Sequence, residues 1–392
     1  MKGLKKKILA VTGIRSEYDI LYPIIKALKD DLRFELKLVL SGAHLSEWHG
    51  SVIETIKSEG FQIADCIDTL LTTNRNTQRI KGIGLLTTGL AQTVEREQPD
   101  MMLVIGDREE SIATALVGNY MDVLVVHYGG GDTVFGNADD PIRFAVSKLA
   151  HIHLTGAKRY AENLKNIGEE DFRVFNVGNP AYDNIRNIPQ KNLTEISDFL
   201  QFDVTDGNFI VLLKHPLSSE KESTYNQMEV TLKAVESFCI NYGYKVVGIY
   251  PNTDPGSFDI LNSIKTFEDR PFIKFFKNIP TDYFVNVMRC CRALAGNSSM
   301  GILEAPFYKL PVVNIGNRQQ GRLNAGNVEF VPHDENEIIK SLEKACFNNS
   351  YRETVINIDN PFGDGHTTEK IIQILSDVDM TDSKWATKQK LC

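Results

Sequence analysis

Short apolar runs alternate with longer amphipathic segments through the first half of the chain. The apolar runs cover residues 7–12, 34–41, 101–107, 122–128 and 150–156. Their near-continuous apolar character is typical of parallel strands that are covered on both faces. Segments with a helical repeat of apolar positions separate them, at residues 18–31, 76–97, 109–120, 141–149 and 157–167. This alternation predicts a doubly wound α/β domain.

The same alternation starts again in the second half. Apolar runs at residues 208–216, 244–252, 272–278, 292–299 and 311–317 are each flanked by helical segments. Between the halves, residues 178–192 are rich in Gly, Pro and Asn, as is typical of a linker. We therefore expect two Rossmann-like, doubly wound domains, residues 1–189 and 190–392. They would face each other across a cleft, with ligands at the carboxyl ends of the strands.

Bulk composition narrows the class of protein. A chain of 392 residues suits two domains, and 42% hydrophobic with 24% charged residues is typical of a globular protein. A net charge of −8 without a long basic run argues against a nucleic-acid partner. No apolar stretch approaches the roughly 20 residues that span a bilayer, so we expect no membrane partner. Six cysteines without metal-ligand spacing are expected to be reduced, in a cytoplasmic protein.

The first half carries charged residues directly after two of its strands. Arg15 lies two residues after Gly13, at the expected start of a helix, where its positive charge could bind an anion. A plain turn between strand and helix explains these residues equally well. Asp107 is either the N-cap of a helix that starts near Arg108 or an acid/base residue. We expect Glu109 and Glu110 to be mostly solvated charges of that helix start.

Two further acidic positions follow the next strand. Residues 129–131 are three glycines, which favour a backbone that approaches a ligand closely, and Asp132 comes next. A proline after Asp140 makes that residue a helix cap. The helix cap does not account for Asp139 and Arg143, so these two residues are available for a functional role.

The second half carries a hydroxyl-rich turn instead. The segment AGNSSMGILEAP (295–306) places small polar residues before a predicted helix, and helix N-terminal amides with serine hydroxyls suit a diphosphate. Glu304 lies one turn further on and suits the two hydroxyls of a ribose; a serine N-cap followed by an ordinary helical Glu is the competing interpretation. His215 ends the first strand of this half and is either structural or an acid/base residue. The candidate binding residues of this half are Asn297, Ser298, Ser299, Gly301, Glu304 and Arg318.

Six motifs in order resemble one known family. They are VTGIRSEYDIL, GDREE, HYGGGD with DDPIR, KHP, GNSSMGILEAP and NIGNRQQGR. Together they cover nearly the whole chain and resemble the hydrolysing UDP-N-acetylglucosamine 2-epimerases, in the branch that supplies sialic acid-like nonulosonic acids. No zinc spacing, Walker loop or G-x-S-x-G motif occurs in the sequence, so we expect neither a metal nor a cofactor.

The resemblance implies a glycosyltransferase-B-like fold and a set of site residues. UDP would be bound by Arg15, Ser298, Ser299, Glu304 and Arg318. The acid/base candidates around the sugar would be Asp107, Asp132, Asp139 and His215, supported by Arg143. The family reaction is an anti elimination of UDP across C1–C2, followed by addition of water to a 2-acetamidoglycal with the opposite C2 configuration. The implied partners are a UDP-sugar, the product UDP, and further copies of the chain in a homodimer or homotetramer.

The chain departs from the family pattern near the sugar. Asp132 stands where the family usually has Glu, and Val134, Phe135 and Phe144 replace other residues of the branch. These changes bear on the substrate, which is either UDP-GlcNAc or a 4-acetamido-6-deoxy analogue on the route to legionaminic acid. Phe135 and Phe144 favour a less polar C6 group. Which carboxylate removes the C2 proton stays open.

Two other functions use part of the same pattern. A glycosyltransferase of the same architecture is the main alternative, because it would use the Gly/Ser turn, Glu304 and the arginines in the same way. It would not need several acids around one sugar. A nucleotide-sugar sensor would bind without turnover, and the four acid/base candidates together argue against it.

Overall fold

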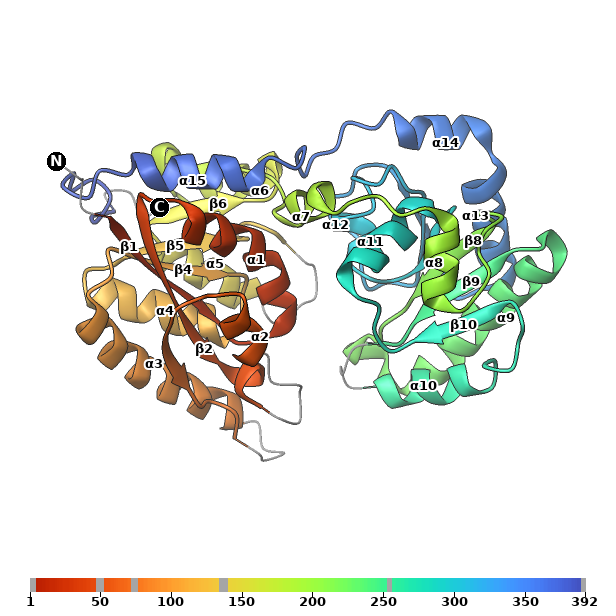
Figure 1. Cartoon of the computed structure of the whole chain (residues 1–392), viewed down its shortest axis with the longest axis horizontal. Coiled ribbons are helices and arrows are strands. Elements are labelled where there is room, and N and C mark those ends of the chain that lie inside the picture. Colours follow the sequence, from red (N-terminus) through yellow and green to blue (C-terminus); the bar gives the residue numbers. More distant parts are fainter. Residues whose placement is uncertain (1–4, 47–52, 72–76, 134–139, 252–255, 389–392) are drawn as a thin grey trace. The chain divides into compact units, whose positions relative to one another are not determined.

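A computed structural model describes residues 5–46, 53–71, 77–133, 140–251 and 256–388 (Figure 1). The chain forms two compact units: Met1–Asn184 with Phe362–Cys392 is unit 1, and Ile185–Pro361 is unit 2. Each unit has one parallel sheet with helices on both faces. The expected class of two doubly wound α/β domains is confirmed.

Unit 1 has a seven-stranded sheet in the order β3-β2-β1-β4-β5-β6-β7. Its strands are β1 (Lys6–Thr12), β2 (Phe34–Ser41), β3 (Ile63–Ile67), β4 (Met101–Ile105), β5 (Leu124–Tyr128), β6 (Ile152–Thr155) and β7 (Val174–Asn176). Its helices are α1 (Arg15–Asp30), α2 (Ile53–Ser58), α3 (Thr77–Glu97), α4 (Glu109–Tyr120), α5 (Asp140–Leu149), α6 (Lys158–Asn166) and α15 (Thr367–Asp377), with short 3₁₀ helices η1 (Gly42–Leu45) and η3 (Asp171–Arg173). Helix α7 (Ala181–Asn187) spans the boundary between the units.

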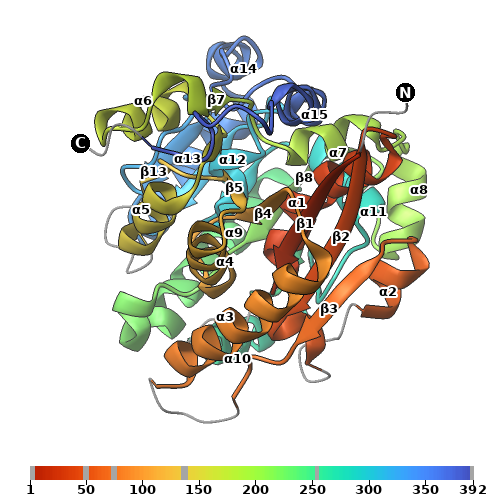
Figure 2. The same cartoon turned by 90° about the vertical axis from the view of Figure 1, so that its left-hand side faces the viewer.

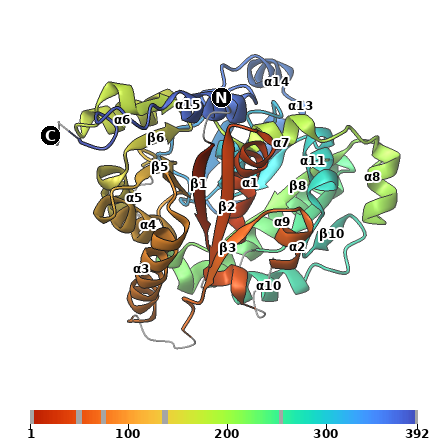
Figure 3. The ribbon, with the colours of Figure 1, turned by 60° about the vertical axis from the view of Figure 1, so that its left-hand side comes forward.

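Both faces of the central strands are buried, which explains their continuous apolar runs. In β1, Ile8 and Ala10 pack with the residues of α1 and α15, whereas Leu9 and Val11 pack with those of α3 and α4. Figures 2 and 3 show α3 and α4 side by side, in agreement with their extensive contact. A strand with helices on both sides needs apolar side chains at every position, so it shows no alternation.

Unit 2 repeats the arrangement with six strands in the order β10-β9-β8-β11-β12-β13. The strands are β8 (Phe209–Leu213), β9 (Lys245–Ile249), β10 (Ile273–Phe276), β11 (Leu294–Gly296), β12 (Val312–Ile315) and β13 (Val328–Val331). The helices are α8 (Leu193–Leu200), α9 (Thr224–Tyr242), α10 (Ser257–Lys265), α11 (Thr281–Cys290), α12 (Met300–Leu303), α13 (Glu335–Phe347) and α14 (Asn349–Ile356), with the 3₁₀ segment η4 (Ser218–Ser223). Helices α9, α10 and α13 cover one face of this sheet, and α8 and α11 cover the other.

The C-terminal segment returns to unit 1, which differs from the expected assignment of residues 190–392 to one domain. Helix α15 packs on α1 and places Ile371 and Leu375 in the core of unit 1 (Figure 1). The carboxylate of Asp183 accepts hydrogen bonds from the backbone N–H groups of Thr367 and Thr368, at 3.1 and 2.9 Å. An amphipathic helix fits the face of any sheet, so its pattern alone does not say which unit it covers.

Candidate active site

Both sheets have a point where the winding direction changes, and some of the sequence-predicted residues follow the strands at these two points. In unit 1 this point lies between β1 and β4, and in unit 2 between β8 and β11. In doubly wound sheets the loops leave in opposite directions at such a point, and ligands commonly bind beside the carboxyl ends of the two strands. Arg15 begins the helix that follows β1, Asp107 lies in the loop after β4, and the loops after β8 and β11 carry His215 and Asn297.

Asp107 forms an ion pair with Arg143 that joins the loop after β4 to α5. Arg143 Nη2 donates to Asp107 Oδ2, and Nη1 donates to the carbonyl oxygen of Gly129 at 3.0 Å. The Arg143 and Asp107 side chains are only 10% and 17% exposed, so little water competes for the pair. Asp107 does not cap α4, because that helix begins at Glu109 with Arg108 in the N-cap position. Arg143 therefore orients Asp107.

Glu110 is buried, which corrects the expectation of a solvated charge. The residue is 6% exposed, and its Oε1 accepts a hydrogen bond from Ser41 Oγ at 3.0 Å. A Cβ atom on Gly13 would lie 1.8 Å from that oxygen, so a glycine is needed where the turn after β1 closes over the carboxyl group. Burial raises the pKa of Glu110. Burial, and then the charge of Glu110, raise the pKa of the neighbouring Glu17 well above its ordinary value.

The backbone and packing of the protein itself account for the three glycines after β5, since Gly129 has a left-handed φ of +90° and the other two are crowded. A Cβ on Gly130 would lie 2.8 Å from Ser147 Oγ, and a Cβ on Gly131 would lie 2.2 Å from the carbonyl oxygen of Tyr160. Gly131 also has a φ of +77°, a left-handed conformation that favours glycine. These residues therefore give no evidence of a close ligand, contrary to the sequence interpretation. Asp132 follows them as a half-buried residue.

The remaining predicted site residues of unit 1 are Asp139 and Arg15. Asp139, together with Val134 and Phe135, lies outside the residues that the structure describes. Arg15 is the first residue of α1, with an exposed side chain 3.8 Å from the carboxylate of Asp19. An exposed guanidinium at a helix N-terminus is a suitable position for receiving an anion.

In unit 2, Asn297 connects the loops that carry His215 and Arg318. Its Oδ1 accepts a hydrogen bond from the His215 backbone N–H at 2.7 Å, and its Nδ2 donates to the His215 carbonyl at 2.9 Å. Its own carbonyl accepts from Arg318 Nη1 and Gln319 Nε2, both at 3.2 Å. The buried side chain of Asn297 thus joins two loops, and its backbone holds a third.

The turn after β11 leads into α12, a helix of one turn that is shorter than expected. Ser298 Oγ accepts a hydrogen bond from the N–H of the first helical residue at 3.3 Å, while Ser299 occupies the N-cap position without a side-chain cap bond. A Cβ on Gly301 would lie 2.8 Å from a methyl group of Val312, so this glycine lets α12 pack closely on β12. Glu304 is the half-buried C-cap residue of α12 and does not lie within a helix.

A buried lysine beside His215 was not singled out from the sequence. Lys214 is 3% exposed, and its Nζ donates to Thr231 Oγ1 at 3.1 Å. Burial lowers the pKa of Lys214 to about 7, although the charge of Glu220 opposes this effect. Glu220 in turn accepts a hydrogen bond from Asn317 Nδ2 at 3.0 Å. The available signal was a lysine directly after an apolar strand, within the KHP motif.

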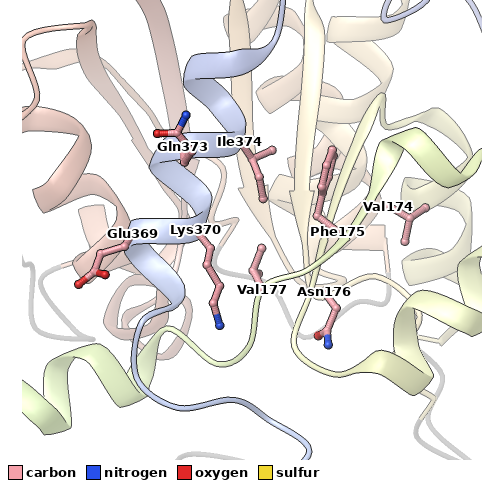
Figure 4. A pocket seen from close by; sticks show the side chains of 8 residues that line it. All are labelled: Val174, Phe175, Asn176, Val177, Glu369, Lys370, Gln373 and Ile374. Atoms are coloured by element: carbon pink, nitrogen blue, oxygen red, sulfur yellow. The ribbon is translucent and has the colours of Figure 1, made fainter.

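A shallow groove on unit 1 lies away from these residues. It is lined by Val174, Phe175, Asn176 and Val177 at β7 and by Glu369, Lys370, Gln373 and Ile374 of α15. Figure 4 shows Lys370 and Ile374 extending from α15 toward β7. Because no sequence-predicted site residue lines this groove, it is not assigned to the site.

Three further features characterise the described part of the chain. No three or more of its His, Cys, Asp and Glu residues form a group that could hold a metal ion. None of its helices combines the length and apolar character needed to cross a membrane. The described cysteines are all free thiols, and three of them (Cys239, Cys291 and Cys346) are buried.

Comparison with known proteins places the chain in a family. The sequence profile described as UDP-N-acetylglucosamine 2-epimerase matches residues 26–376. The UDP-N,N'-diacetylbacillosamine 2-epimerase (hydrolyzing) of Legionella pneumophila is 29% identical over 373 residues, which are 95% of this chain and 96% of that protein. The GDP/UDP-N,N'-diacetylbacillosamine 2-epimerase (hydrolyzing) of Campylobacter jejuni is 30% identical over 342 residues, which are 87% of each chain.

The fold is shared with solved structures of low sequence identity. The crystal structure of UDP-GlcNAc 2-epimerase from Neisseria meningitidis bound to UDP-GlcNAc has a TM-score of 0.78 at 18% identity, and the match covers 94% of this chain and 99% of that chain. This similarity confirms the glycosyltransferase-B-like fold class. Since the profile match extends over most of the sequence, the chain belongs to the UDP-N-acetylglucosamine 2-epimerase family.

Proposed function

We infer that the protein is a hydrolysing 2-epimerase, which converts a UDP-N-acetylglucosamine-type sugar into UDP and the free 2-epimeric sugar. The names of the Legionella and Campylobacter relatives support the hydrolysing branch. The observation that carries the chemistry is the Asp107–Arg143 pair at the switch point of unit 1. An elimination needs a positioned acid or base beside the sugar, and an oriented carboxylate supplies one.

The proposed reaction has two balanced steps. A base removes the proton at C2 while the bond between C1 and the UDP oxygen breaks, and the electron pair of that bond leaves with UDP. A 2-acetamidoglycal results. Water then adds its oxygen to C1, and C2 receives a proton on the face opposite to the one that lost it. The overall reaction uses one water and releases UDP and the free epimer.

The residues of unit 1 are proposed to carry the proton transfers. Asp107 is the first acid/base candidate, because Arg143 and the loop after β4 hold it in one orientation. Asp132 and Asp139 are the further carboxylate candidates of this unit. Arg15 is proposed to meet the diphosphate, because it combines an exposed guanidinium with a helix N-terminus.

The residues of unit 2 are proposed to bind UDP and assist its departure. Negative charge develops on the diphosphate as the C1–O bond breaks, and fixed positive groups stabilise that charge. Arg318 is held at the carboxyl edge of the sheet by its bond to Asn297, and His215 is held by the same residue. The remaining proposed contacts are Ser298, Ser299, Gly301 and Glu304, with Glu304 at the ribose.

Two substrates fit this proposal. UDP-N,N'-diacetylbacillosamine comes first, because both relatives at 29% and 30% identity are named for it. The half-buried Phe144 next to Arg143 also favours a less polar C6 group. UDP-GlcNAc is the second candidate, since the N. meningitidis structure with the same fold contains it. Either free epimer would serve the synthesis of nonulosonic acids.

The test is incubation with each UDP-sugar in D₂O without an acceptor. A hydrolysing epimerase releases UDP and incorporates deuterium at C2 of the free sugar. A glycosyltransferase releases little UDP under these conditions, and a sensor binds without turnover; either result rejects the proposal. The ratio of kcat/KM for the two sugars identifies the substrate, and we expect it to exceed about tenfold in favour of the diacetamido sugar. The homodimer or homotetramer and the cytoplasmic location stay predictions of the sequence.

A further inference from the structure

His127 is the central residue of a hydrogen-bond network that includes the Asp107–Arg143 pair. It sits on β5 with no exposed surface, and its Nε2 lies 2.7 Å from the carbonyl oxygen of Gly106. Gly106 directly precedes Asp107, so the imidazole holds the turn that carries the carboxylate. The Gly106 N–H also donates to the Tyr128 carbonyl at 2.9 Å, which fixes this turn to β5 from both sides.

The other ring nitrogen of His127 faces the helix that carries Arg143. Its Nδ1 lies 3.5 Å from Ser147 Oγ, and the single O–H of Ser147 is shared between this nitrogen and the Arg143 carbonyl, which lies 3.0 Å from Oγ. A Cβ on Gly130 would lie 2.8 Å from Ser147 Oγ and 3.2 Å from His127 Nδ1. Only a glycine at that position lets the imidazole and the hydroxyl approach each other.

The ring has one defined protonation state. A carbonyl oxygen only accepts hydrogen bonds, so the Gly106 contact places the ring proton on Nε2. Burial lowers the pKa of His127 to about 3, and the positive charges of Arg143 and Lys388 act in the same direction. The imidazole is therefore neutral at physiological pH, and its unprotonated Nδ1 faces the shared O–H of Ser147.

We propose that His127 is a positioning residue for the elimination: it holds the Gly106–Asp107 turn and, through Ser147, the α5 turn of Arg143 in one mutual arrangement. This role rests on the function proposed above. His127 does not touch the reacting atoms in this proposal. It acts through Asp107 and Arg143, and small errors in their placement reduce the rate of the chemical step more than they reduce substrate binding.

The variants His127→Leu, His127→Gln and His127→Asn separate positioning from general stability. The amide nitrogen of Gln reaches the place of Nε2 and can donate to Gly106, whereas the shorter Asn reaches only the place of Nδ1. We expect kcat to fall about 10- to 100-fold in the Leu and Asn variants with KM and UDP affinity nearly unchanged, and Gln to restore most of it. Equal activity of Gln and Asn, or an unchanged kcat in the Leu variant, would overturn the proposal.

His153 provides the matched control. It pairs with His127 in register on the neighbouring strand β6 and has no exposed surface, but its Nε2 contacts Glu169 at 2.9 Å. His153→Leu should lower thermal stability without lowering kcat at temperatures where it stays folded. If His127→Leu and His153→Leu lower kcat equally, the role of His127 is only structural.

A readout without turnover keeps the two proposals distinguishable. If the wild-type protein releases no UDP from either sugar, the proposed function fails. The His127 arrangement is then tested by the ¹⁵N shifts of its ring, where we expect an Nε2-protonated neutral tautomer that does not titrate above about pH 5. An Nδ1-protonated tautomer, or titration near pH 6.5, would overturn the arrangement itself.

Discussion

Asn297 and His215 exchange two hydrogen bonds, of 2.7 and 2.9 Å, and so lock the loops after β11 and β8 to each other. Asn297→Ala removes both bonds and should loosen the loop after β11, whose backbone carbonyl at residue 297 accepts the hydrogen bond of Arg318. We expect the Kd for UDP, measured by calorimetry, to rise about tenfold. Asn297→Asp keeps the acceptor for the His215 N–H and should have an intermediate Kd. An unchanged Kd in the Ala variant would show that these loops take no part in UDP binding.

Asp107→Asn should abolish most turnover while UDP binding survives. The amide cannot exchange a proton as a carboxylate does, and such losses reduce kcat about 10²- to 10⁴-fold. Because the proposed UDP contacts lie mainly in unit 2, the Kd for UDP should change less than about threefold. Arg143→Met should lower kcat in the same way, since it removes the group that orients Asp107. Loss of UDP affinity in the Asn variant would instead make Asp107 a structural residue.

Glu110→Gln should change how stability depends on pH. The folded pKa of Glu110 is raised above its ordinary value of 4.5, so the folded state keeps a proton that the unfolded chain loses. This contribution to stability is complete at pH below 4.5 and is lost as pH rises through the folded pKa. Gln cannot ionise, so the free energy of unfolding of the variant relative to wild type, measured by urea unfolding, should rise between acidic and neutral pH.

The adjacent Glu109 is the control for this experiment. Burial raises its pKa, but the hydrogen bond from Arg79 and nearby positive charges outweigh burial and lower it overall. A lowered pKa contributes stability that is present above the ordinary value and is lost as pH falls. Glu109→Gln should therefore change the pH dependence in the opposite direction. The same sign for both variants would contradict the burial of Glu110.

Lys214→Met should stabilise the protein below neutral pH. The folded pKa of Lys214 is lowered from 10.5 to about 7, so folding below pH 7 buries a positive charge. The unfolded chain binds the proton more readily between these values, so this destabilising effect fades as pH rises from 7 to 10.5. We expect chemical unfolding to show that the free energy of unfolding of the Met variant exceeds that of the wild type by about 2–4 kcal/mol at pH 6 and by little at pH 10. A loss of stability at pH 6 would show that Lys214 is compensated as a cation.

Arg173 should decide whether the C-terminal segment stays on unit 1. This fully buried guanidinium donates to Glu170 Oε2 and to the carbonyls of Trp385 and Thr387, at 2.8, 2.8 and 2.7 Å. Arg173→Met leaves those acceptors without their donor, and the removal of one partner of a buried ion pair lowers the free energy of unfolding by about 3–5 kcal/mol. Hydrogen exchange should show faster exchange of α15 and of residues 378–388 in the variant. Unchanged protection there would contradict this anchoring role.

The sequence predicted the positions of single site residues but not the contacts between them. Asp107 and His215 could be placed at strand ends because apolar runs mark where central strands stop. The burial of Glu110 could not, because it depends on Ser41 and Gly13, which are distant in sequence. Likewise, the pairing of Asp107 with Arg143 depends on how the loop after β4 meets α5.

The central strands, the edge strand β10 and most helices follow from the sequence, whereas the other three edge strands do not. Central strands are buried on both faces, so their apolar runs are continuous and local. Strands β3, β7 and β13 lie at sheet edges, are only partly buried, and were not predicted. The return of α15 to unit 1 was also missed, because an amphipathic helix specifies a buried face but not the sheet it covers. The sequence by itself thus determined the repeated α/β class and the strand ends that bear polar residues. Tertiary contacts decided the edge strands β3, β7 and β13, the place of the C-terminal helix, and which of the polar residues are buried and paired.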